Sequence, residues 1–274
     1  MFKRQTTGSV VCTSCGSLVG VRDDKCFNCG RRNPGLWGFA PLLRSLGTDL
    51  GFVPLVIWGS SALYIISMLL SGTAMRMGGG IFGFLAPDSG MLFLLGASGG
   101  IPVFGYGRWW TVLSAGWLHG SLLHIIFNMM WVRDLGPTVA DMFGPGRMVI
   151  IYTVAGVSGF LVSSAAYVFL PHLPFLSGAG FTVGASASVF GFLGALVCYG
   201  RRTGSSLTRS EALRYALILG FFGFVMRGVD NFAHAGGFLG GYLAARYLDP
   251  LKPERIDHVV IALVCLGATL AAIA

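Results

Sequence analysis

The sequence predicts an all-α polytopic membrane protein with a small cysteine-bearing unit at its N-terminus. Hydrophobic residues make up 54% of the 274 residues, and charged residues only 11%. The apolar side chains gather in long runs and do not alternate with polar ones, which is typical of a chain whose solvent is lipid. Two closely spaced cysteine pairs precede the first apolar run and indicate a separate unit.

Six or seven apolar runs are long enough to cross a bilayer as helices, in which the backbone satisfies its own hydrogen bonds. The predicted spans are about 52–72, 120–140, 148–170, 184–200, 212–226, 231–248 and 258–274. The fifth is short and the last ends with the chain. Between the first two spans, residues 73–118 hold apolar pieces that glycine and proline interrupt and that are too short to cross. We expect this loop to lie partly in the membrane interface.

The distribution of lysine and arginine predicts the orientation. With a cytoplasmic N-terminus, 16 of the 19 basic residues lie on the cytoplasmic side, and Arg76, Arg108 and Arg227 lie on the other. This bias follows the positive-inside rule, so it accounts for the net charge of +8 without nucleic acid as a partner. The first 30 residues are polar, so no signal peptide is expected.

The N-terminal cysteines occur as 12-CTSC-15 and 26-CFNC-29, with ten residues between the pairs. Each pair presents two thiolates on a tight turn, and together the pairs supply the four soft ligands of a tetrahedral structural zinc ion. Disulfides are the weaker alternative, because the predicted orientation puts these residues in a reducing compartment. Four ligands leave no open coordination position, so we expect a structural or docking module and not a catalytic centre. The predicted ligands are Cys12, Cys15, Cys26 and Cys29.

Four segments follow from these patterns. We assign residues 1–35 to a zinc-ribbon and residues 36–51, LWGFAPLLRSLGTDLG, to a linker whose aromatic, apolar and basic content suits the membrane interface. Residues 52–248 form the membrane core, and residues 249–274 form a second linker and an additional transmembrane helix. The zinc-ribbon could bind a cytoplasmic protein partner.

Polar side chains inside the predicted spans are costly and therefore point to function. His124 and Asn128 are four residues apart and share one face of the second span. Ser186 follows Gly184 at the start of the fourth span, where free backbone N–H groups can point at an anion. His234 lies near the start of the sixth span. All three spans enter from the outer side, so the three groups share one depth.

Groups at one depth can combine into an acyl-transfer site. A serine becomes a nucleophile when a neutral histidine takes its proton, and the tetrahedral intermediate needs donors aimed at its oxyanion. We expect Ser186 to attack, His234 to act as base and then acid, and His124, Asn128 and the Ser186 N–H to hold the oxyanion. The nearest carboxylate, Asp230, lies one turn before His234 at the end of the span, so the sequence favours a dyad.

Simpler explanations exist for each feature. Small residues four apart, here Gly237, Gly241 and Ala245, serve close helix packing in membranes, and we expect them to let the fourth and sixth spans approach. A single intramembrane histidine often makes only an interhelical hydrogen bond. The combination of Ser186, a histidine and a histidine–asparagine pair on three spans favours catalysis.

Three segments resemble the rhomboid intramembrane serine proteases in order and spacing. They are 95-LGASGGIPVFGYGRWWTVLSAGWLHGSLLHIIFNMMW-131, GASAS at 184–188 and AHAGGFLGG at 233–241. The resemblance covers about residues 50–248 and implies a six-helix catalytic core, here with a seventh helix added. It implies the roles given above for Ser186, His234, His124 and Asn128, and a GxxxG-type stripe that matches Gly237 and Gly241.

The resemblance also implies an activity. A rhomboid hydrolyses peptide bonds in or near transmembrane segments of membrane protein substrates, within the bilayer and without a cofactor for catalysis. Compact rhomboids imply the bacterial cytoplasmic membrane as location, with the active site opening to the outer side. The alternative is a rhomboid-like pseudoprotease that binds transmembrane clients without cleaving them. A transporter is disfavoured, because no inverted repeat is evident.

Three positions depart from the family pattern. Ala187 follows the serine where the family usually has glycine, and its methyl group could crowd the oxyanion pocket or be accommodated. Thr111 follows Trp110 where the family has arginine, with Arg108 two places before Trp110. Phe190 replaces a tyrosine that packs under the catalytic histidine. None of these changes removes a catalytic atom.

Overall fold

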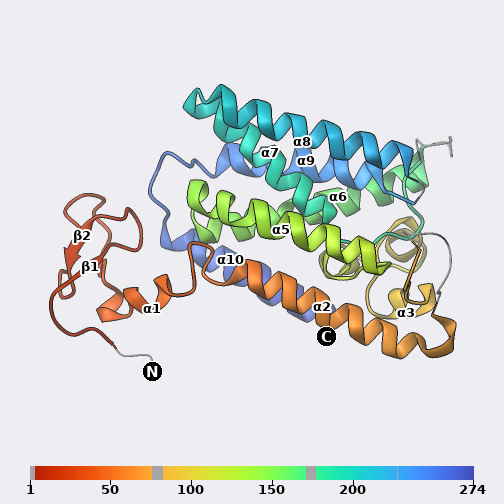
Figure 1. Cartoon of the computed structure of the whole chain (residues 1–274), viewed down its shortest axis with the longest axis horizontal. Coiled ribbons are helices and arrows are strands. Elements are labelled where there is room, and N and C mark those ends of the chain that lie inside the picture. The colour runs from red at the N-terminus through yellow and green to blue at the C-terminus, as the bar shows by residue number, and fades with distance from the viewer. Residues whose placement is uncertain (1–3, 76–82, 171–176, 227) are drawn as a thin grey trace.

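The structure is a computed structural model that describes residues 4–75, 83–170, 177–226 and 228–274, without the side chains of Leu43 and Arg44. Seven helices of 17–25 residues dominate these ranges and run side by side, with a small two-stranded unit at one end of the bundle (Figure 1). Lys3, Arg76 and Arg227, which contribute to the predicted charge bias, lie outside the described residues.

The long helices coincide with the predicted spans to within a few residues, with the largest difference at the start of the fifth. They are α2 (Phe52–Ser71), α5 (Leu122–Phe143), α6 (Pro145–Phe169), α7 (Ser186–Thr203), α8 (Ser206–Val225), α9 (Asn231–Tyr247) and α10 (Ile256–Ile273). The predicted all-α class is therefore confirmed.

Hydropathy alone identifies fewer spans than the helix pattern does. Among the described residues, three helices are long and apolar enough to cross a membrane: α2 with the turn after it, α6 and α10. A fourth candidate is the bent pair formed by 111–117 and α5, with an angle of 94° between its parts. Helix α7 does not meet this criterion, although every residue from 187 to 198 is buried. Its small and polar residues face other helices and not lipid, which lowers its hydropathy.

The loop between α2 and α5 is built from short helices, as its interrupted sequence predicts. They are η2 (Gly72–Ala74), α3 (Ser89–Leu94), the π-helical η3 (Ile101–Gly105), α4 (Thr111–Ser114) and η4 (Ala115–Trp117). Arg108 anchors this loop, because its guanidinium donates to the carbonyls of Phe93 and Leu94 and lies 4.4 Å above the Phe93 ring. Buried Thr111 donates to the Arg108 carbonyl at 2.7 Å. The displaced arginine therefore still secures the loop.

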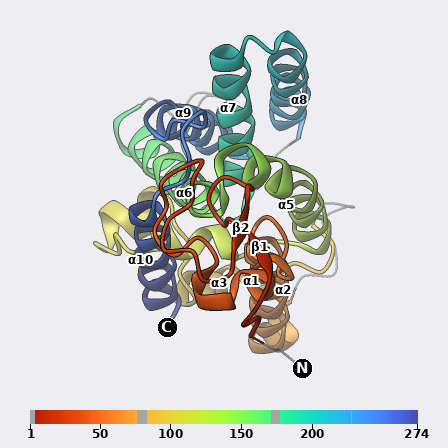
Figure 2. The same ribbon diagram turned by 90° about the vertical axis from the view of Figure 1, so that its left-hand side faces the viewer.

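The N-terminal unit pairs β1 (Ser9–Val11) with β2 (Leu18–Gly20) in an antiparallel hairpin, with Val10 opposite Val19. Its small core consists of Val10, Cys12, Val19, Val21, Cys26 and Ala40. The short helices η1 (Leu36–Gly38) and α1 (Ala40–Arg44) lead from this unit toward α2. Seen along the bundle, the unit lies over the helix ends (Figure 2).

The N-terminal unit is also joined to the segment between α9 and α10. The Ser14 hydroxyl donates to the Glu254 carbonyl at 2.9 Å, and the Glu254 carboxylate accepts from the Arg147 N–H at 2.9 Å. Burial raises the pKa of the Glu254 carboxyl, against the hydrogen bond and charge of Arg147. The buried Arg147 guanidinium donates to the carbonyls of Phe143, Lys252 and Pro253. This cluster ties the unit to the start of α6.

Helices α6, α7 and α9 meet along glycines. A Cβ at Gly237 of α9 would overlap the Ala187 carbonyl of α7, and one at Gly241 would overlap the Gly191 carbonyl. On α6, a Cβ at Gly159 would lie 2.6 Å from the carbonyl oxygen of Ala233. The absence of side chains lets the backbones approach closely, so the N-terminal ends of α7 and α9 lie next to each other.

Candidate active site

Ser186 and His234 come together at the N-terminal ends of α7 and α9. Ser186 is the first residue of α7, and His234 lies in the first turn of α9. The Ser186 Oγ and the His234 Nε2 are 2.9 Å apart, at hydrogen-bonding distance. The His234 ring stacks on Phe190, with centroids 4.2 Å apart and an angle of 15° between the planes. Phe190 therefore orients the imidazole through its ring, without a hydroxyl.

No carboxylate completes a triad in the described part of the chain. The His234 Nδ1 is buried and has no hydrogen-bond partner among the described residues. The Asp230 carboxylate instead accepts from the Ala233 N–H at 3.0 Å and from the Ser163 hydroxyl at 2.6 Å. The arrangement is that of a serine–histidine pair.

His124 lies beside the backbone that leads into the serine. The Gly120 N–H donates to the His124 Nδ1 at 3.3 Å, which assigns the ring proton to Nε2. A Cβ on Gly184 would lie 2.6 Å from that Nε2, and Gly184 has φ +123°. The Nε2–H therefore borders the chain two residues before Ser186. On its other side, the His124 ring packs edge-on against buried His119, with centroids 5.2 Å apart.

Asn128 and the start of α7 add further donors at the same place. The Asn128 amide donates to the His124 carbonyl at 2.9 Å and has a second N–H available. It also borders Gly184, where a Cβ would lie 3.8 Å from its Nδ2. The Ser186 N–H opens the first turn of α7, where helix geometry provides no intrahelical acceptor. His124 and Asn128 thus both border Gly184, two residues before Ser186, and the Ser186 N–H adds a third donor to this part of the chain.

The segment before Ser186 is fixed by the loop between α2 and α5. Ser98 and Thr182 exchange backbone hydrogen bonds of 3.1 and 2.8 Å, and the Gly184 N–H donates to the Ala115 carbonyl at 2.9 Å. The segment also rests on α6 through Ser163, which accepts the Ala179 N–H at 3.1 Å. Sequence analysis did not identify Ser163, because a serine among small residues carries no distinguishing local signal.

Ala187, the departure next to the serine, is accommodated by α6. Its side chain is 1% exposed and faces Gly159, where a Cβ would lie 2.7 Å from the Ala187 methyl. The missing side chain at Gly159 provides the space for that methyl group. Packing between α6 and α7 therefore absorbs the additional carbon.

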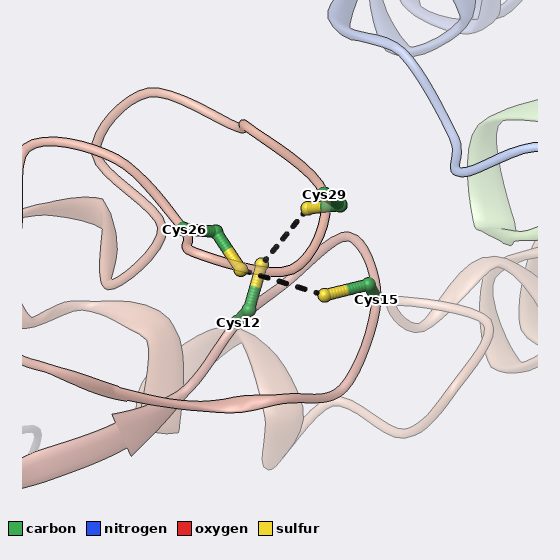
Figure 3. Close-up of side chains that lie close together, drawn as sticks. All are labelled: Cys12, Cys15, Cys26 and Cys29. Carbon is green, nitrogen blue, oxygen red and sulfur yellow. Dashed lines mark hydrogen bonds between the residues drawn. The ribbon is translucent and has the colours of Figure 1, made fainter.

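The four N-terminal cysteines converge from two turns of the same form (Figure 3). Their Sγ atoms all lie within 4.8 Å of one another, with Cys12 3.8 Å from Cys29 and Cys15 3.6 Å from Cys26. Zinc with Zn–S bonds of about 2.3 Å would hold tetrahedral sulfurs roughly 3.8 Å apart, so the residues fit a metal ion. Each turn closes on a glycine with positive φ, Gly16 or Gly30, whose N–H donates to the first cysteine's carbonyl.

These features define an integral membrane protein that carries a serine–histidine pair where two helix N-termini meet. Comparison with protein-family models matches residues 106–250 to the Rhomboid domain. The chain belongs to the rhomboid family, a family of intramembrane proteases. The resemblance seen in the sequence motifs is thereby confirmed.

Individual relatives agree with this assignment. Rhomboid protease GluP of Bacillus subtilis (strain 168) is 32% identical over 202 residues, which cover 68% of this chain and 38% of that protein. RHOMBOID-like protein 4 of Arabidopsis thaliana is 29% identical over 213 residues, 70% of this chain and 50% of that protein. Rhomboid-like protease 3 of Toxoplasma gondii is 25% identical over 201 residues, 70% of this chain and 68% of that protein. The chain therefore spans half or less of the first two relatives.

Proposed function

We propose that the protein is an intramembrane serine endopeptidase that works through the Ser186–His234 dyad. The hydrogen-bonding distance of 2.9 Å between the Ser186 Oγ and the His234 Nε2 carries the proposal. A relative named as a rhomboid protease, 32% identical, supports it. The substrates are membrane proteins that meet the enzyme within the bilayer.

The chemistry divides into two acyl transfers. The Ser186 Oγ attacks the scissile carbonyl carbon while the His234 Nε2 takes the hydroxyl proton. His124, Asn128 and the Ser186 N–H donate to the oxyanion, and His234 then gives its proton to the leaving amine. In the second half, water attacks the acyl-enzyme with His234 again as base, and the carboxylic acid leaves as Ser186 regains its proton. The reaction needs no metal or cofactor at this site.

Substrate helices must open before they can be cut. Backbone carbonyls in a transmembrane helix are hydrogen-bonded and shielded, so the scissile segment has to unwind near the nucleophile. Glycine, proline or other weak helix formers near the outer end of the substrate span would lower that cost. We expect substrates with such residues to be cut fastest.

A pseudoprotease that binds transmembrane clients is the second candidate. Several relatives carry the name RHOMBOID-like protein, which states no proteolytic activity. Hydrolysis is favoured over client binding alone because the serine, the histidine and the oxyanion donors are all present together. A client-binding protein has no need for that set.

The remaining proposals concern the chain as a whole. We propose that Cys12, Cys15, Cys26 and Cys29 hold one structural zinc ion and that residues 1–35 form a zinc-ribbon on the cytoplasmic side. Residues 36–51 would lie in the interface, residues 52–248 would form the catalytic core and residues 249–274 a linker with one more span. The active site would open to the outer side of a bacterial cytoplasmic membrane.

Cleavage of a single-span reporter in proteoliposomes tests the activity. We expect product from the wild type. Ser186→Ala and His234→Ala should each lower kcat by at least about 10³-fold, because removing either member of a dyad costs nearly as much as removing both. Equal product from all three proteins would place catalysis elsewhere. A wild type that binds the reporter without cutting it, even when a helix-breaking residue is introduced into the reporter, would favour the pseudoprotease.

A further inference from the structure

The Asp230 carboxylate makes two contacts at the start of the helix that carries His234. One oxygen caps α9 by accepting the Ala233 N–H at 3.0 Å. The other accepts the Ser163 hydroxyl of α6 at 2.6 Å. A Ser, Asn or Asp cap satisfies the helix end equally well, so capping alone does not explain why an acidic residue reaches across to α6.

Ser163 connects this carboxylate to the chain that leads to the nucleophile. Its side chain is fully buried, and its oxygen accepts the Ala179 N–H at 3.1 Å while its hydrogen points to Asp230. A carboxylate can only accept, so it fixes the direction of the hydroxyl and leaves the oxygen lone pairs for Ala179. Each polar atom of this link therefore has a defined role.

The segment that contains Ala179 is pressed onto α6 and held from its other side. A Cβ on Gly178 would overlap the Ser163 carbonyl, so the backbone lies directly on the helix. The Ala179 carbonyl accepts the Gly100 N–H at 2.9 Å. Movement of the Ala179 peptide would therefore disturb both α6 and the loop between α2 and α5.

We propose that Asp230 and Ser163 are positioning residues that hold the segment before Ser186 in register with helix α9. The pair links a position four residues before His234 to one seven residues before Ser186. The pair acts on the distance between Ser186 and His234 through the backbone, because the side-chain hydrogen bonds of Asp230 and Ser163 within the described residues go to each other, to Ala233 and to Ala179. This inference rests on the proposed proteolytic function.

Two substitutions separate this role from helix capping and from general stability. Ser163→Ala removes the link and leaves the cap intact. Asp230→Ser keeps a good N-cap residue but is too short to reach α6. Ser164→Ala is the matched control, because Ser164 is the neighbouring residue on α6, is also fully buried and has no hydrogen-bond partner for its hydroxyl among the described residues.

The experiment measures reporter cleavage, the rate at which a fluorophosphonate labels Ser186, and amide exchange over residues 177–182. We expect Ser163→Ala and Asp230→Ser to lower kcat and the labelling rate by about 10- to 100-fold through misplacement of the serine, with KM unchanged. The double variant should be no slower than the slower single variant, because one link is broken in each. Exchange over 177–182 should accelerate, and Ser164→Ala should match the wild type.

The pH dependence distinguishes positioning from an electrostatic role. Because Asp230 does not contact His234, the midpoint of the pH profile for labelling should stay the same while the plateau falls. A shifted midpoint, a normal rate in both variants, or an equal loss in Ser164→Ala would each overturn the proposal. If the wild type neither cleaves nor labels, the proposed function fails, while exchange over 177–182 still reports on the link.

Discussion

At the scale of single residues, the site depends on what Gly184 lacks. Its φ of +123° is unfavourable for any residue with a side chain, and the His124 Nε2 occupies the direction a Cβ would take. The same glycine borders Asn128 and bonds to the Ala115 carbonyl through its N–H. One missing side chain therefore lets the two proposed oxyanion donors, His124 and Asn128, approach the chain that leads to Ser186.

Gly184→Ala should abolish most of the activity. The strain costs about 1–3 kcal/mol, and displacement of His124 should lower kcat by about 10²- to 10³-fold, as loss of an oxyanion donor does. Reporter cleavage and thermal unfolding in detergent measure the two effects. Gly204→Ala is the control, because it has φ +74° but nothing within 4 Å of a Cβ. It should lose stability and keep kcat, and an equal loss of kcat would contradict the role of His124.

At the level of helices, the contact between α7 and α9 sets the distance between Ser186 and His234. Gly237 and Gly241 let the helices approach until backbone meets backbone, and the close packing continues on α6 through Gly159. The N-terminal ends of α7 and α9 carry Ser186 and His234. A wider separation of these helices would therefore move Ser186 away from His234, its proposed base.

Gly237→Ala should destabilise the protein and slow catalysis. The new methyl overlaps the Ala187 carbonyl, which belongs to a helix backbone and cannot rotate away, and overpacking costs about 1–3 kcal/mol. Unfolding temperature and cleavage should both fall. Gly220→Ala on α8 has nothing within 4 Å of its Cβ, so it should be neutral or slightly stabilising. A Gly237→Ala protein with wild-type stability would show that the helices are free to separate.

At the scale of the whole molecule, the N-terminal unit is anchored to the helix bundle. Ser14 lies between Cys12 and Cys15 and bonds to the Glu254 carbonyl, while the Glu254 carboxylate binds the start of α6. A metal ion that organises this turn would therefore also stabilise the junction of α6 with the segment before α10. Figure 1 shows that this junction lies at the end of the bundle where the two-stranded unit sits.

Metal removal should lower the stability of the full chain. We expect about one zinc ion per chain by metal analysis, and a lower unfolding temperature after chelation, because structural zinc contributes folding free energy. Ser14→Ala should retain the zinc and lose about 0.5–1.5 kcal/mol of unfolding free energy, the usual net value of one hydrogen bond. The unfolding temperature of Cys26→Ser should not change when the chelator is added, because this variant lacks one of the four ligands. An unchanged unfolding temperature of the wild type after chelation would contradict a structural metal ion.

The all-α membrane fold, the positions of the long helices and the family could be predicted from the amino-acid sequence. Apolar runs, cysteine spacing and motif order are local signals, so they can be recognised without knowledge of how the helices pack. Ser186, His234, His124 and Asn128 could also be selected, because the order of spans places them at one depth. The distance between Ser186 and His234 depends on the glycine contacts between α6, α7 and α9, whereas the approach of His124 and Asn128 from α5 depends on Gly184.

The contacts that hold these residues in place depend on the three-dimensional packing and could not be predicted from the sequence. In the sequence, Asp230 is a carboxylate four residues before a histidine. In the structure, its carboxylate accepts a hydrogen bond from the Ser163 hydroxyl, 67 residues away in the chain. The link between Ser14 and Glu254 joins residues 240 positions apart. Such contacts form only when segments far apart in the chain come within hydrogen-bonding distance, and the local sequence around a serine or an aspartate does not indicate which segment will lie opposite.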